Sequence, residues 1–364
     1  MIRYGIIGTG MMGIEHIQNV LNIDGAEITA LADPNKSSLE LARGLLPINS
    51  KVTCHGDYRE IIKQGVCDAV VVASPNMTHH GILMDLMDTG LHILVEKPLC
   101  TTVEQCNEIV DKYNNQSSKF PNRIVWVGLE YRFMPPIARL IQEVANGVVG
   151  ELKMLAIREH RYPFLQKVDN WNRFNRNSGG TLVEKCCHFF DLMRLIVGSE
   201  PIRVMASGGQ DVNHLDELYN GERPDILDNA YVIVDFENGV RALLDLCMFA
   251  EATYNQEELA ATGNLGKIEA LIPENIVRIG RRGKHFVGNI DSYKVESPQV
   301  GYEGFHHGSS YIQHLEFLKA ITSTGPTMVS LIDGMKAVAI GIAAQLSIAQ
   351  GRPIEMGEVF GHSN

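Results

Sequence analysis

A short apolar run, 2–7, leads directly into a glycine-spaced turn and then into a segment with helical periodicity. The glycines are Gly8, Gly10 and Gly13, in the spacing Gly-x-Gly-x-x-Gly. Gly8 permits a tight turn, Gly10 lets the backbone approach a pyrophosphate, and Gly13 lets the helix pack closely on the strand. The first amide groups of the helix then face the bound anion. The pattern predicts a dinucleotide-binding strand–turn–helix at the start of a parallel α/β fold.

An acidic residue follows at the distance that such a site requires. A second apolar run, 26–32, ends at Asp33, where a carboxylate accepts hydrogen bonds from the adenosine ribose and repels a 2′-phosphate. Lys36 partly offsets that repulsion, and we favour NAD over NADP as the cofactor. Met11 and Met12 of the glycine loop are assigned to cofactor binding as well. The alternative is an ordinary strand–turn–helix in which Asp33 is a turn residue or a helix cap.

Composition excludes several classes of protein. The 364 residues, 45% apolar and 21% charged, are typical of a globular protein with room for two domains. A formal net charge of −11 disfavours binding to nucleic acid or to an anionic membrane surface. Seven cysteines without CxxC spacing indicate neither a disulfide framework nor a thiolate zinc site. We expect no membrane span and, because the first strand starts near residue 2, no signal peptide, and therefore a cytoplasmic protein.

Apolar β-branched runs alternate with helical segments through the first third of the chain. Continuous apolar runs such as 69–73 and 91–95 predict parallel strands that are covered on both faces. With a last strand at 123–128 they complete a six-stranded, doubly wound Rossmann sheet. We expect residues 1–128 to form this dinucleotide-binding domain.

The pattern changes in the rest of the chain to short β-like runs separated by turn residues. Asn238-Gly239, between two such runs, is a strong hairpin signal. Residues 129–364 are expected to form an α+β domain for substrate binding and oligomerisation, with a large, open, mostly antiparallel sheet. Its terminal helix, about 333–350, is expected to pack back on the body of the chain.

Two of the buried strands end in polar residues and a proline. Ser74-Pro75-Asn76 follows one strand, with His79 three residues later, and Glu96-Lys97-Pro98 follows the other. Open α/β sheets bind ligands at the carboxyl ends of their strands, so both segments are expected to join the glycine loop in binding the cofactor. Lys97 is a candidate for chemistry at this edge. The alternative is a surface lysine or an ion-pair partner of Glu96.

A polar stripe runs along a second informative segment, 182–197. If this segment is helical, Glu184, His188 and Asp191 share one face, where they require water, a substrate pocket or buried partners. Three structural alternatives stay open. Thr181-x-x-Glu184 has the spacing of a capping box, His188 could be a core histidine, and Asp191 could serve to orient it.

Together these features resemble the Gfo/Idh/MocA oxidoreductases, which include glucose-fructose oxidoreductase and inositol dehydrogenases. The resemblance covers most of the chain. Its most specific parts are Glu96-Lys97-Pro98 and the acid-x-x-x-His segment that follows Gly179-Gly180. There is one departure, because members such as inositol dehydrogenase have aspartate where this chain has Glu184. The extra methylene shifts the carboxylate and leaves the substrate open.

The resemblance implies a nicotinamide-dependent dehydrogenase for a sugar, an inositol-like polyol or a sugar acid, with catalytic residues Lys97, His188 and Glu184. Oxidation of an alcohol needs a base, and an imidazole suits that role near neutral pH. Lys97 would stabilise the developing alkoxide, or would itself accept the proton. The family also implies a homodimer or homotetramer. Two alternatives remain, a lyase or hydrolase that uses bound NAD transiently, and a non-catalytic dinucleotide sensor.

Substrate contacts are expected from the irregular segment 160–175 and from the loop 304–308. Trp171 offers a flat face to sugar C–H groups, although a solvated surface loop is the alternative for this segment. The adjacent histidines 79–80 and 306–307 lack helpful acids or cysteines nearby, so we expect no metal site. The candidate substrate-binding residues are Tyr131, His160, Trp171, Asn172, Arg173, Glu184, His188 and His306.

Overall fold

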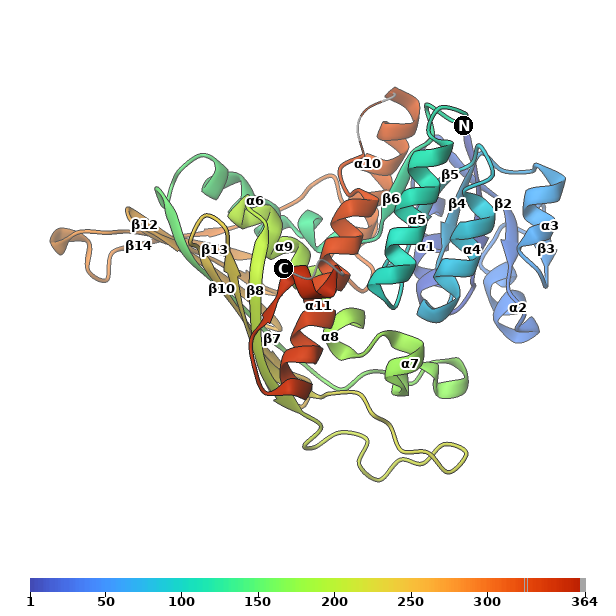
Figure 1. The fold of residues 1–364 in the computed structure, drawn as a ribbon. Helices are drawn as coiled ribbons and strands as arrows, with labels where there is room; N and C mark the ends of the chain where they lie inside the picture. Colours follow the sequence, from blue (N-terminus) through green and yellow to red (C-terminus); the bar gives the residue numbers. More distant parts are fainter. Residues whose placement is uncertain (324, 326, 361–364) are drawn as a thin grey trace. The chain divides into compact units, whose positions relative to one another are not determined.

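In the computed structural model, residues 1–323, 325 and 327–360 are described, and they form two compact units (Figure 1). The first unit consists of Met1–Glu130, Lys167–Trp171 and Pro298–Met335. The second consists of Tyr131–Gln166, Asn172–Ser297 and the chain from Lys336 onward. The first unit is therefore completed by segments that come late in the sequence. The domain limit expected after residue 128 stays a prediction.

The first unit contains a parallel sheet with the strand order β3-β2-β1-β4-β5-β6. All four residues of β4 are buried, as expected for a central strand whose apolar side chains are covered on both faces. The order changes direction between β1 and β4, which confirms the predicted doubly wound Rossmann sheet. The strands are β1 (Ile2–Ile7), β2 (Ala26–Ala32), β3 (Thr53–His55), β4 (Ala69–Val72), β5 (His92–Val95) and β6 (Val125–Val127). The α-helices are α1 (Met11–Leu21), α2 (Lys36–Gly44), α3 (Arg59–Gln64), α4 (His79–Leu86), α5 (Val103–Gln116) and α10 (Ser309–Ser323).

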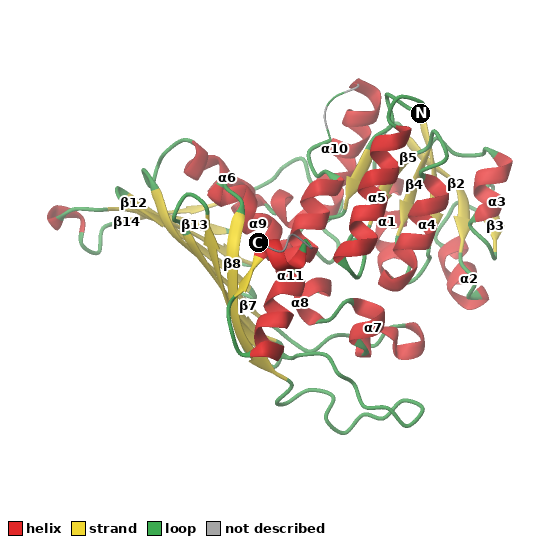
Figure 2. Ribbon diagram, viewed as in Figure 1, coloured by secondary structure: helices red, strands yellow, loops and turns green. Residues whose placement is uncertain are grey.

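The second unit contains a nine-stranded sheet in the order β14-β13-β12-β11-β7-β10-β9-β8-β15 (Figure 2). Only β7 and β10 pair in parallel among the described strands of this sheet, so the predicted open, mostly antiparallel sheet is confirmed. Buried and less buried residues alternate along β9, β10 and β11, which places one face of these strands in the core. The strands are β7 (Leu152–His160), β8 (Pro201–Gly209), β9 (Asn229–Phe236), β10 (Arg241–Cys247), β11 (Glu257–Gly263), β12 (Gly266–Ile272), β13 (Ile276–Arg281), β14 (Ile290–Lys294) and β15 (Ile354–Glu355).

Several helices accompany this sheet. The single helix expected at 182–197 is wrong, because α8 ends at Glu184 and α9 begins only at Cys187. The break separates Glu184 from the helix that carries His188. The α-helices are α6 (Pro135–Ala145), α7 (Asn175–Ser178), α8 (Thr181–Glu184), α9 (Cys187–Val197), α11 (Leu331–Gln350) and α12 (Met356–Val359). The 3-10 helices of the chain are η1 (Asn76–Thr78), η2 (Glu130–Phe133), η3 (Val168–Arg173) and η4 (Lys284–Phe286).

Helix α11 is long and apolar enough to qualify by length and composition as a membrane span, although no such segment was expected. Its most apolar window has a mean hydropathy of 1.5, and 61% of that window is buried inside the fold. Within the second unit, Gly341 of α11 lies against the backbone of Leu182, and the Gln345 side chain donates to the Gly179 carbonyl. Burial in the protein core accounts for the apolar composition.

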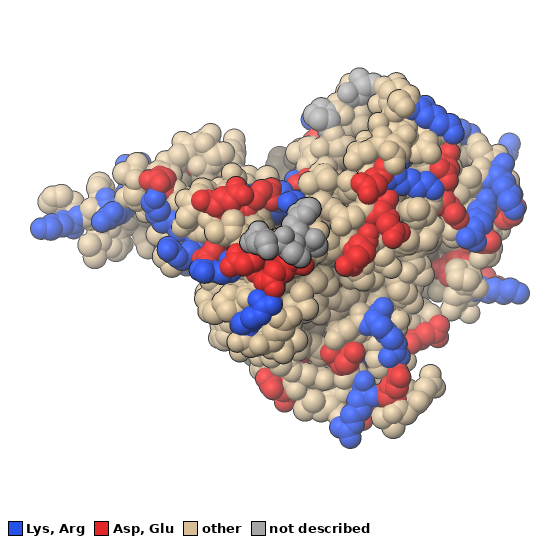
Figure 3. All heavy atoms as spheres, viewed as in Figure 1, with Lys and Arg blue, Asp and Glu red and all other residues tan. Residues whose placement is uncertain are grey.

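Charged side chains of both signs are interspersed on the face of the molecule shown in Figure 3. The net charge of −11 is therefore not gathered there into one acidic surface.

Candidate functional site

The glycine loop of the first unit has the geometry that its spacing predicts. Gly8 has a φ of +89°, and a Cβ atom there would lie 2.6 Å from the Ser74 amide nitrogen. A Cβ on Gly13 would lie 2.1 Å from the Gly8 carbonyl oxygen, so only glycine lets α1 pack this closely on the turn. A Cβ on Gly10 would meet nothing within 4 Å. The space beside Gly10, the glycine that a pyrophosphate would approach, is therefore open.

This loop lies at the switch point of the Rossmann sheet. β1 pairs with β2 on one side and with β4 on the other, so the turns after β1 and β4 flank the crevice where such sheets bind ligands. Helix α1 begins after Gly10 without a side-chain cap and without an acidic residue in its first turn. Its first amide groups, which include those of Met11 and Met12, are therefore suited to an anion.

His79 ties together two loops at this edge. Its Nδ1 lies 2.8 Å from the Pro98 carbonyl oxygen and its Nε2 lies 3.0 Å from the Ser74 carbonyl oxygen. The ring is fully buried, and burial lowers the pKa of His79 below its ordinary value. Asn76 is also buried, at the start of η1. His79 therefore holds the loop after β4 against the loop after β5 that follows Lys97.

Asp33 follows β2 and its carboxylate organises the glycine loop. One oxygen accepts from the Thr9 amide at 2.7 Å and from the Thr9 hydroxyl at 3.1 Å, and the other accepts from the Asn35 amide at 2.8 Å. The side chain that caps α2 is that of Asn35, so the helix-cap alternative for Asp33 is wrong. The position after β2 is the one from which a carboxylate contacts the ribose of a dinucleotide.

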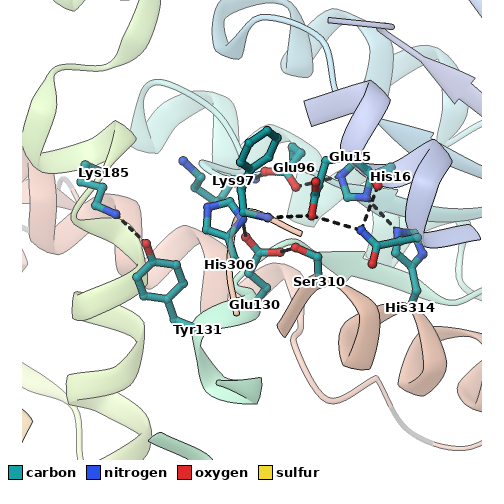
Figure 4. Close-up of polar contacts among 12 residues, drawn as sticks. Glu15, His16, Glu96, Lys97, Glu130, Tyr131, Lys185, His306, Ser310 and His314 are labelled. Atoms are coloured by element: carbon teal, nitrogen blue, oxygen red, sulfur yellow. Dashed lines mark hydrogen bonds and ion pairs between the residues drawn. The ribbon is translucent and has the colours of Figure 1, made fainter. Parts of the chain in front are cut away.

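Glu96 and Lys97 follow β5 at the same edge of the sheet. The Glu96 carboxylate accepts from the Lys97 backbone amide at 3.2 Å and lies 2.9 Å from Nε2 of His16 in α1. Nδ1 of His16 in turn lies 2.8 Å from Nε2 of His314 in α10 (Figure 4). All three of these acidic and imidazole side chains are buried. Sequence reasoning missed both histidines, which are far apart in the chain and lie in no local motif.

His306, a predicted substrate contact, lies in the first unit beside a buried acid. Its Nδ1 is 3.0 Å from Glu130, whose carboxylate also accepts from the Ser310 hydroxyl at 2.5 Å (Figure 4). Burial alone would raise the pKa of Glu130, but the charge and hydrogen bond of His306 and the Ser310 hydroxyl hold it at about 2. The acid network therefore stays ionised at neutral pH, and it fixes the loop that carries His306.

The second unit holds the acid-x-x-x-His segment in its core. Glu184 and His188 are 2% and 1% exposed, respectively. α8 begins after Gly180 without a side-chain cap, and the Thr181 hydroxyl donates instead to the Leu227 carbonyl, so the capping-box alternative for Glu184 is wrong. Asp191 accepts two hydrogen bonds from the Arg132 guanidinium, one of them at 2.5 Å.

The imidazole of His188 lies flat on a tyrosine. Its ring and that of Tyr131 are stacked with centroids 3.9 Å apart and planes 10° apart. The Tyr131 hydroxyl accepts a hydrogen bond of 2.6 Å from Lys185 Nζ (Figure 4). Tyr131 was predicted to contact substrate, whereas Lys185 was not singled out from the sequence. A lysine next to a candidate acid carries no periodic signal that could have identified it.

Lys185 belongs to a buried ionic cluster in the second unit. Its ammonium lies 2.8 Å from Glu159 Oε1, and Glu257 is opposite Glu159 in the pairing of β11 with β7. Burial and then the Glu159 charge raise the pKa of Glu257 to about 8. Arg161, 3.4 Å from Glu159, adds a second cation. Arg161 was noted from the sequence as a basic residue beside the substrate loop, but the two acids were missed, because their proximity depends on strand register.

Other predicted substrate contacts have intramolecular partners within their own units. His160 lies 3.0 Å from Asp245, Asn172 donates to the Leu165 carbonyl at 3.0 Å, and Arg173 donates to Glu217 at 2.8 Å. In the first unit, the Lys167 ammonium lies 4.6 Å from the ring centroid of Trp171. The structure thus assigns Trp171, His306, Lys97 and the cofactor candidates to the first unit, and Tyr131, His160, Asn172, Arg173, Glu184 and His188 to the second. No cluster of three or more metal-ligating side chains occurs among the described residues.

Comparison with known families matches both parts of the chain. Residues 2–122 match the model for the NAD-binding Rossmann fold of the Gfo/Idh/MocA oxidoreductase family, and residues 141–356 match the model for its C-terminal alpha/beta domain. The chain belongs to the Gfo/Idh/MocA oxidoreductase family. The resemblance read from the glycine loop, Glu96-Lys97-Pro98 and the acid-x-x-x-His segment is therefore confirmed.

Relatives within the Gfo/Idh/MocA family differ in activity. The chain is similar to myo-inositol 2-dehydrogenase of Thermotoga maritima, with 27% identity over 99% of this chain and 100% of that protein. It is also similar to 2,7-anhydro-N-acetylneuraminate hydratase of Escherichia coli, with 24% identity over the full length of both chains. A solved levoglucosan dehydrogenase in complex with NADH and levoglucosan has the same fold, with a TM-score of 0.83 and 20% identity over 98% of this chain and 99% of that one.

Proposed function

We propose that this protein transfers hydride between a nicotinamide cofactor and a secondary alcohol of a sugar, an inositol-like polyol or a sugar acid. Two features at the same edge of the sheet carry the proposal. They are the open space beside Gly10 and a lysine, Lys97, that follows β5. The first provides room for a pyrophosphate, and the second provides a cation where a developing alkoxide needs one. The dehydrogenases among the relatives support this class of substrate.

The residues present fit a dinucleotide. A Cβ added at Gly8 or Gly13 would collide with backbone atoms, whereas a Cβ added at Gly10 would meet nothing within 4 Å. The first amides of α1 have no side-chain cap. We infer that the cofactor is NAD rather than NADP, because the Asp33 carboxylate would repel a 2′-phosphate. The test compares dissociation constants for NADH and NADPH in the wild type and in Asp33→Ala. NADH should bind more tightly to the wild type, and the variant should narrow the difference. A wild type that prefers NADPH would contradict the inference. The proposed cofactor-binding residues are Gly8, Gly10, Met11, Met12, Gly13, Asp33, Ser74, Pro75, Asn76, His79, Glu96 and Lys97.

In the proposed reaction, the bound nicotinamide supplies the hydride acceptor and the residues of the chain handle the proton. His188 takes the proton of the substrate hydroxyl, while the Lys97 ammonium hydrogen-bonds the same oxygen and stabilises its negative charge. Glu184 holds a neighbouring hydroxyl or orients the imidazole. Convergence of Lys97 and His188 on one oxygen is part of this proposal. In the inverse assignment, Lys97 accepts the proton. The pH dependence of the residual rates of Lys97→Met and His188→Ala distinguishes the two assignments, because a variant that still has the proton acceptor should retain a pH-dependent rate.

The test of the dehydrogenase is a screen of polyols, aldoses and sugar acids for cofactor reduction, followed by absorbance. We expect turnover of at least one compound, and Lys97→Met and His188→Ala should each reduce kcat by at least about 100-fold with cofactor binding intact. Lys319→Met, an exposed lysine of α10, is the matched control and should retain full activity. No turnover across the whole panel would contradict the proposal.

A second candidate is a lyase or hydrolase that oxidises its substrate and then reduces it again with bound NAD. The full-length similarity to a hydratase favours it. It predicts that purified protein carries tightly bound NAD and forms product without net cofactor reduction. A non-catalytic dinucleotide sensor predicts instead that the cellular role survives Lys97→Met. We further propose a cytoplasmic homodimer or homotetramer that binds neither nucleic acid nor membrane.

A further inference from the structure

The Tyr131 ring lies flat against the His188 imidazole. The two rings are nearly parallel, with a centroid separation of 3.9 Å, and both side chains are almost completely buried. A ring stacked in this way cannot tilt without opening a gap in a close-packed core. A proton acceptor must present one nitrogen to one oxygen, so the plane of the imidazole matters for catalysis.

Tyr131 is itself held by an ammonium group. The Lys185 Nζ donates to its hydroxyl at 2.6 Å and lies 4.8 Å from the centroid of its ring. Because a buried hydroxyl without a partner is costly, this hydrogen bond holds the hydroxyl end of the phenol ring in place. Lys185 follows Glu184 directly and precedes α9, which carries His188.

The position of Lys185 is stabilised by Glu159, which has a second acid opposite it on the neighbouring strand. Glu159 of β7 and Glu257 of β11 are directly opposite each other in the sheet. Two carboxylates in that arrangement repel each other when both are ionised. Burial and then the Glu159 charge raise the pKa of Glu257 to about 8, which favours the protonated form of this side chain at neutral pH, while Glu159 pairs with Lys185 at 2.8 Å. The ammonium is therefore fixed from the sheet side and presented to Tyr131.

We propose that Lys185 and Tyr131 are positioning residues for His188. This inference rests on the proposed function for its kinetic consequence, but the geometry that it describes is independent of any substrate. Lys185 fixes Tyr131, and Tyr131 fixes the plane of the imidazole. Neither residue is required to contact the reacting atoms.

A spectroscopic experiment tests the geometry in the full-length protein without a substrate. The protein has 13 histidines, and 13C labelling of their Cε1 positions gives resonances of which that of His188 is identified by its loss in His188→Gln. Stacking on Tyr131 should shield the His188 Hε1 proton. We expect Tyr131→Leu to remove that upfield shift and Tyr131→Phe to retain most of it. An unchanged shift in Tyr131→Leu overturns the inference.

A kinetic experiment tests the role. Tyr131→Leu should lower kcat and kcat/KM by the same factor, about 10- to 100-fold, with unchanged NADH affinity, because misplacement of a catalytic group affects the transition state. Lys185→Met and Tyr131→Phe should each cost less and should not be additive, since both remove the same hydrogen bond. Additive effects would overturn the role of Lys185. Lys267→Met, a lysine of β12 paired with Glu269 and about half exposed, is the control that leaves kcat unchanged.

Lys185→Met leaves Glu159 without its partner and could fail to fold for that reason alone. The double variant Lys185→Met, Glu159→Gln removes the unpaired charge. We expect it to recover the thermal midpoint of the wild type but not its kcat. Recovery of both would mean that Lys185 is merely structural and would overturn the inference. If the His188 shift behaves as expected and no variant or wild type turns over any substrate, the positioning stands and the proposed function fails.

Discussion

His16 and Glu96 join the first helix of the Rossmann unit to the end of its fifth strand, through an Nε2 to Oε1 distance of 2.9 Å. Both side chains are buried, and His314 of α10 completes the chain of contacts. The backbone amide of Lys97 donates to the same Glu96 carboxylate. The candidate catalytic lysine therefore follows a residue whose side chain is fixed from two other elements.

His16→Asn should destabilise the protein by about 1–3 kcal/mol, because loss of the imidazole leaves a buried oxygen of Glu96 without its hydrogen-bond partner. Urea denaturation measures the change. The matched surface pair is Lys319 and Glu316, so Lys319→Ala should change stability by less than about 0.5 kcal/mol. A similar small change in His16→Asn would show that the buried contact contributes little.

Gly10→Ala and Gly13→Ala should separate cofactor binding from folding. Gly10 has a negative φ and open space beside it, so alanine there should fold normally and weaken NADH binding by about tenfold or more through its contact with the pyrophosphate. Alanine at Gly13 would place its Cβ 2.1 Å from the Gly8 carbonyl and should lower the thermal midpoint as well. Calorimetry of NADH binding and of unfolding distinguishes the two. Unchanged NADH affinity in Gly10→Ala would place the pyrophosphate elsewhere.

Glu130→Gln should change the acid stability of the protein. The pKa of Glu130 is held at about 2, below its ordinary value, so the folded state binds this proton less readily than the unfolded state. Its contribution is therefore fully present above about pH 4.5 and is lost as the pH falls toward 2. The variant should be less stable at pH 7 and should show a weaker loss in that window. Urea midpoints from pH 7 to 2 measure this, and Glu104→Gln, an exposed residue of α5, should follow the wild type.

Glu257→Gln should change the pH dependence of stability in the opposite sense, between about pH 4.5 and pH 8. Burial and Glu159 raise the pKa of Glu257 to about 8, so the folded state keeps a proton that the unfolded state releases. Wild-type stability should fall from about pH 4.5 to pH 8, by roughly 1.4 kcal/mol per pH unit at most from this group. Glutamine mimics the protonated acid and should flatten that slope. The exposed Glu251→Gln should leave the slope unchanged, and an equal slope in Glu257→Gln would show that the acid is ionised in the fold.

The first sheet was predicted well from local sequence patterns, because these patterns reflect what its strands, turns and helices physically require. Gly8, at a φ of +89°, and Gly13, where an added Cβ would lie 2.1 Å from a carbonyl oxygen, cannot be replaced, so their spacing is visible in the sequence. Strand β14 was missed for the converse reason. All five of its residues are exposed, so no alternation of buried and exposed side chains marks it. The helix break between Glu184 and Cys187 was missed because no glycine or proline lies there.

The candidate site was predicted only where its residues follow a strand or share a short motif. Lys97 and His79 are found in this way. Glu159 and Glu257 meet because β11 pairs with β7 in a particular register, and no single-chain pattern gives that register. The Glu130 network likewise depends on α10, which belongs to the first unit although it comes late in the sequence. Local sequence patterns do not predict a contact between residues so far apart in the chain.

The return of residues 298–335 to the first unit sets an order for biosynthesis. Phe317 of α10 packs edge-on against both Tyr4 and Trp126, and the Val127 amide donates to the Val329 carbonyl at 3.1 Å. A nascent chain that has emerged only as far as residue 130 lacks Phe317 and would expose the rings of Tyr4 and Trp126 to water. The nucleotide-binding unit therefore completes its core late in translation, and a truncation directly after β14 would remove residues that belong to both units.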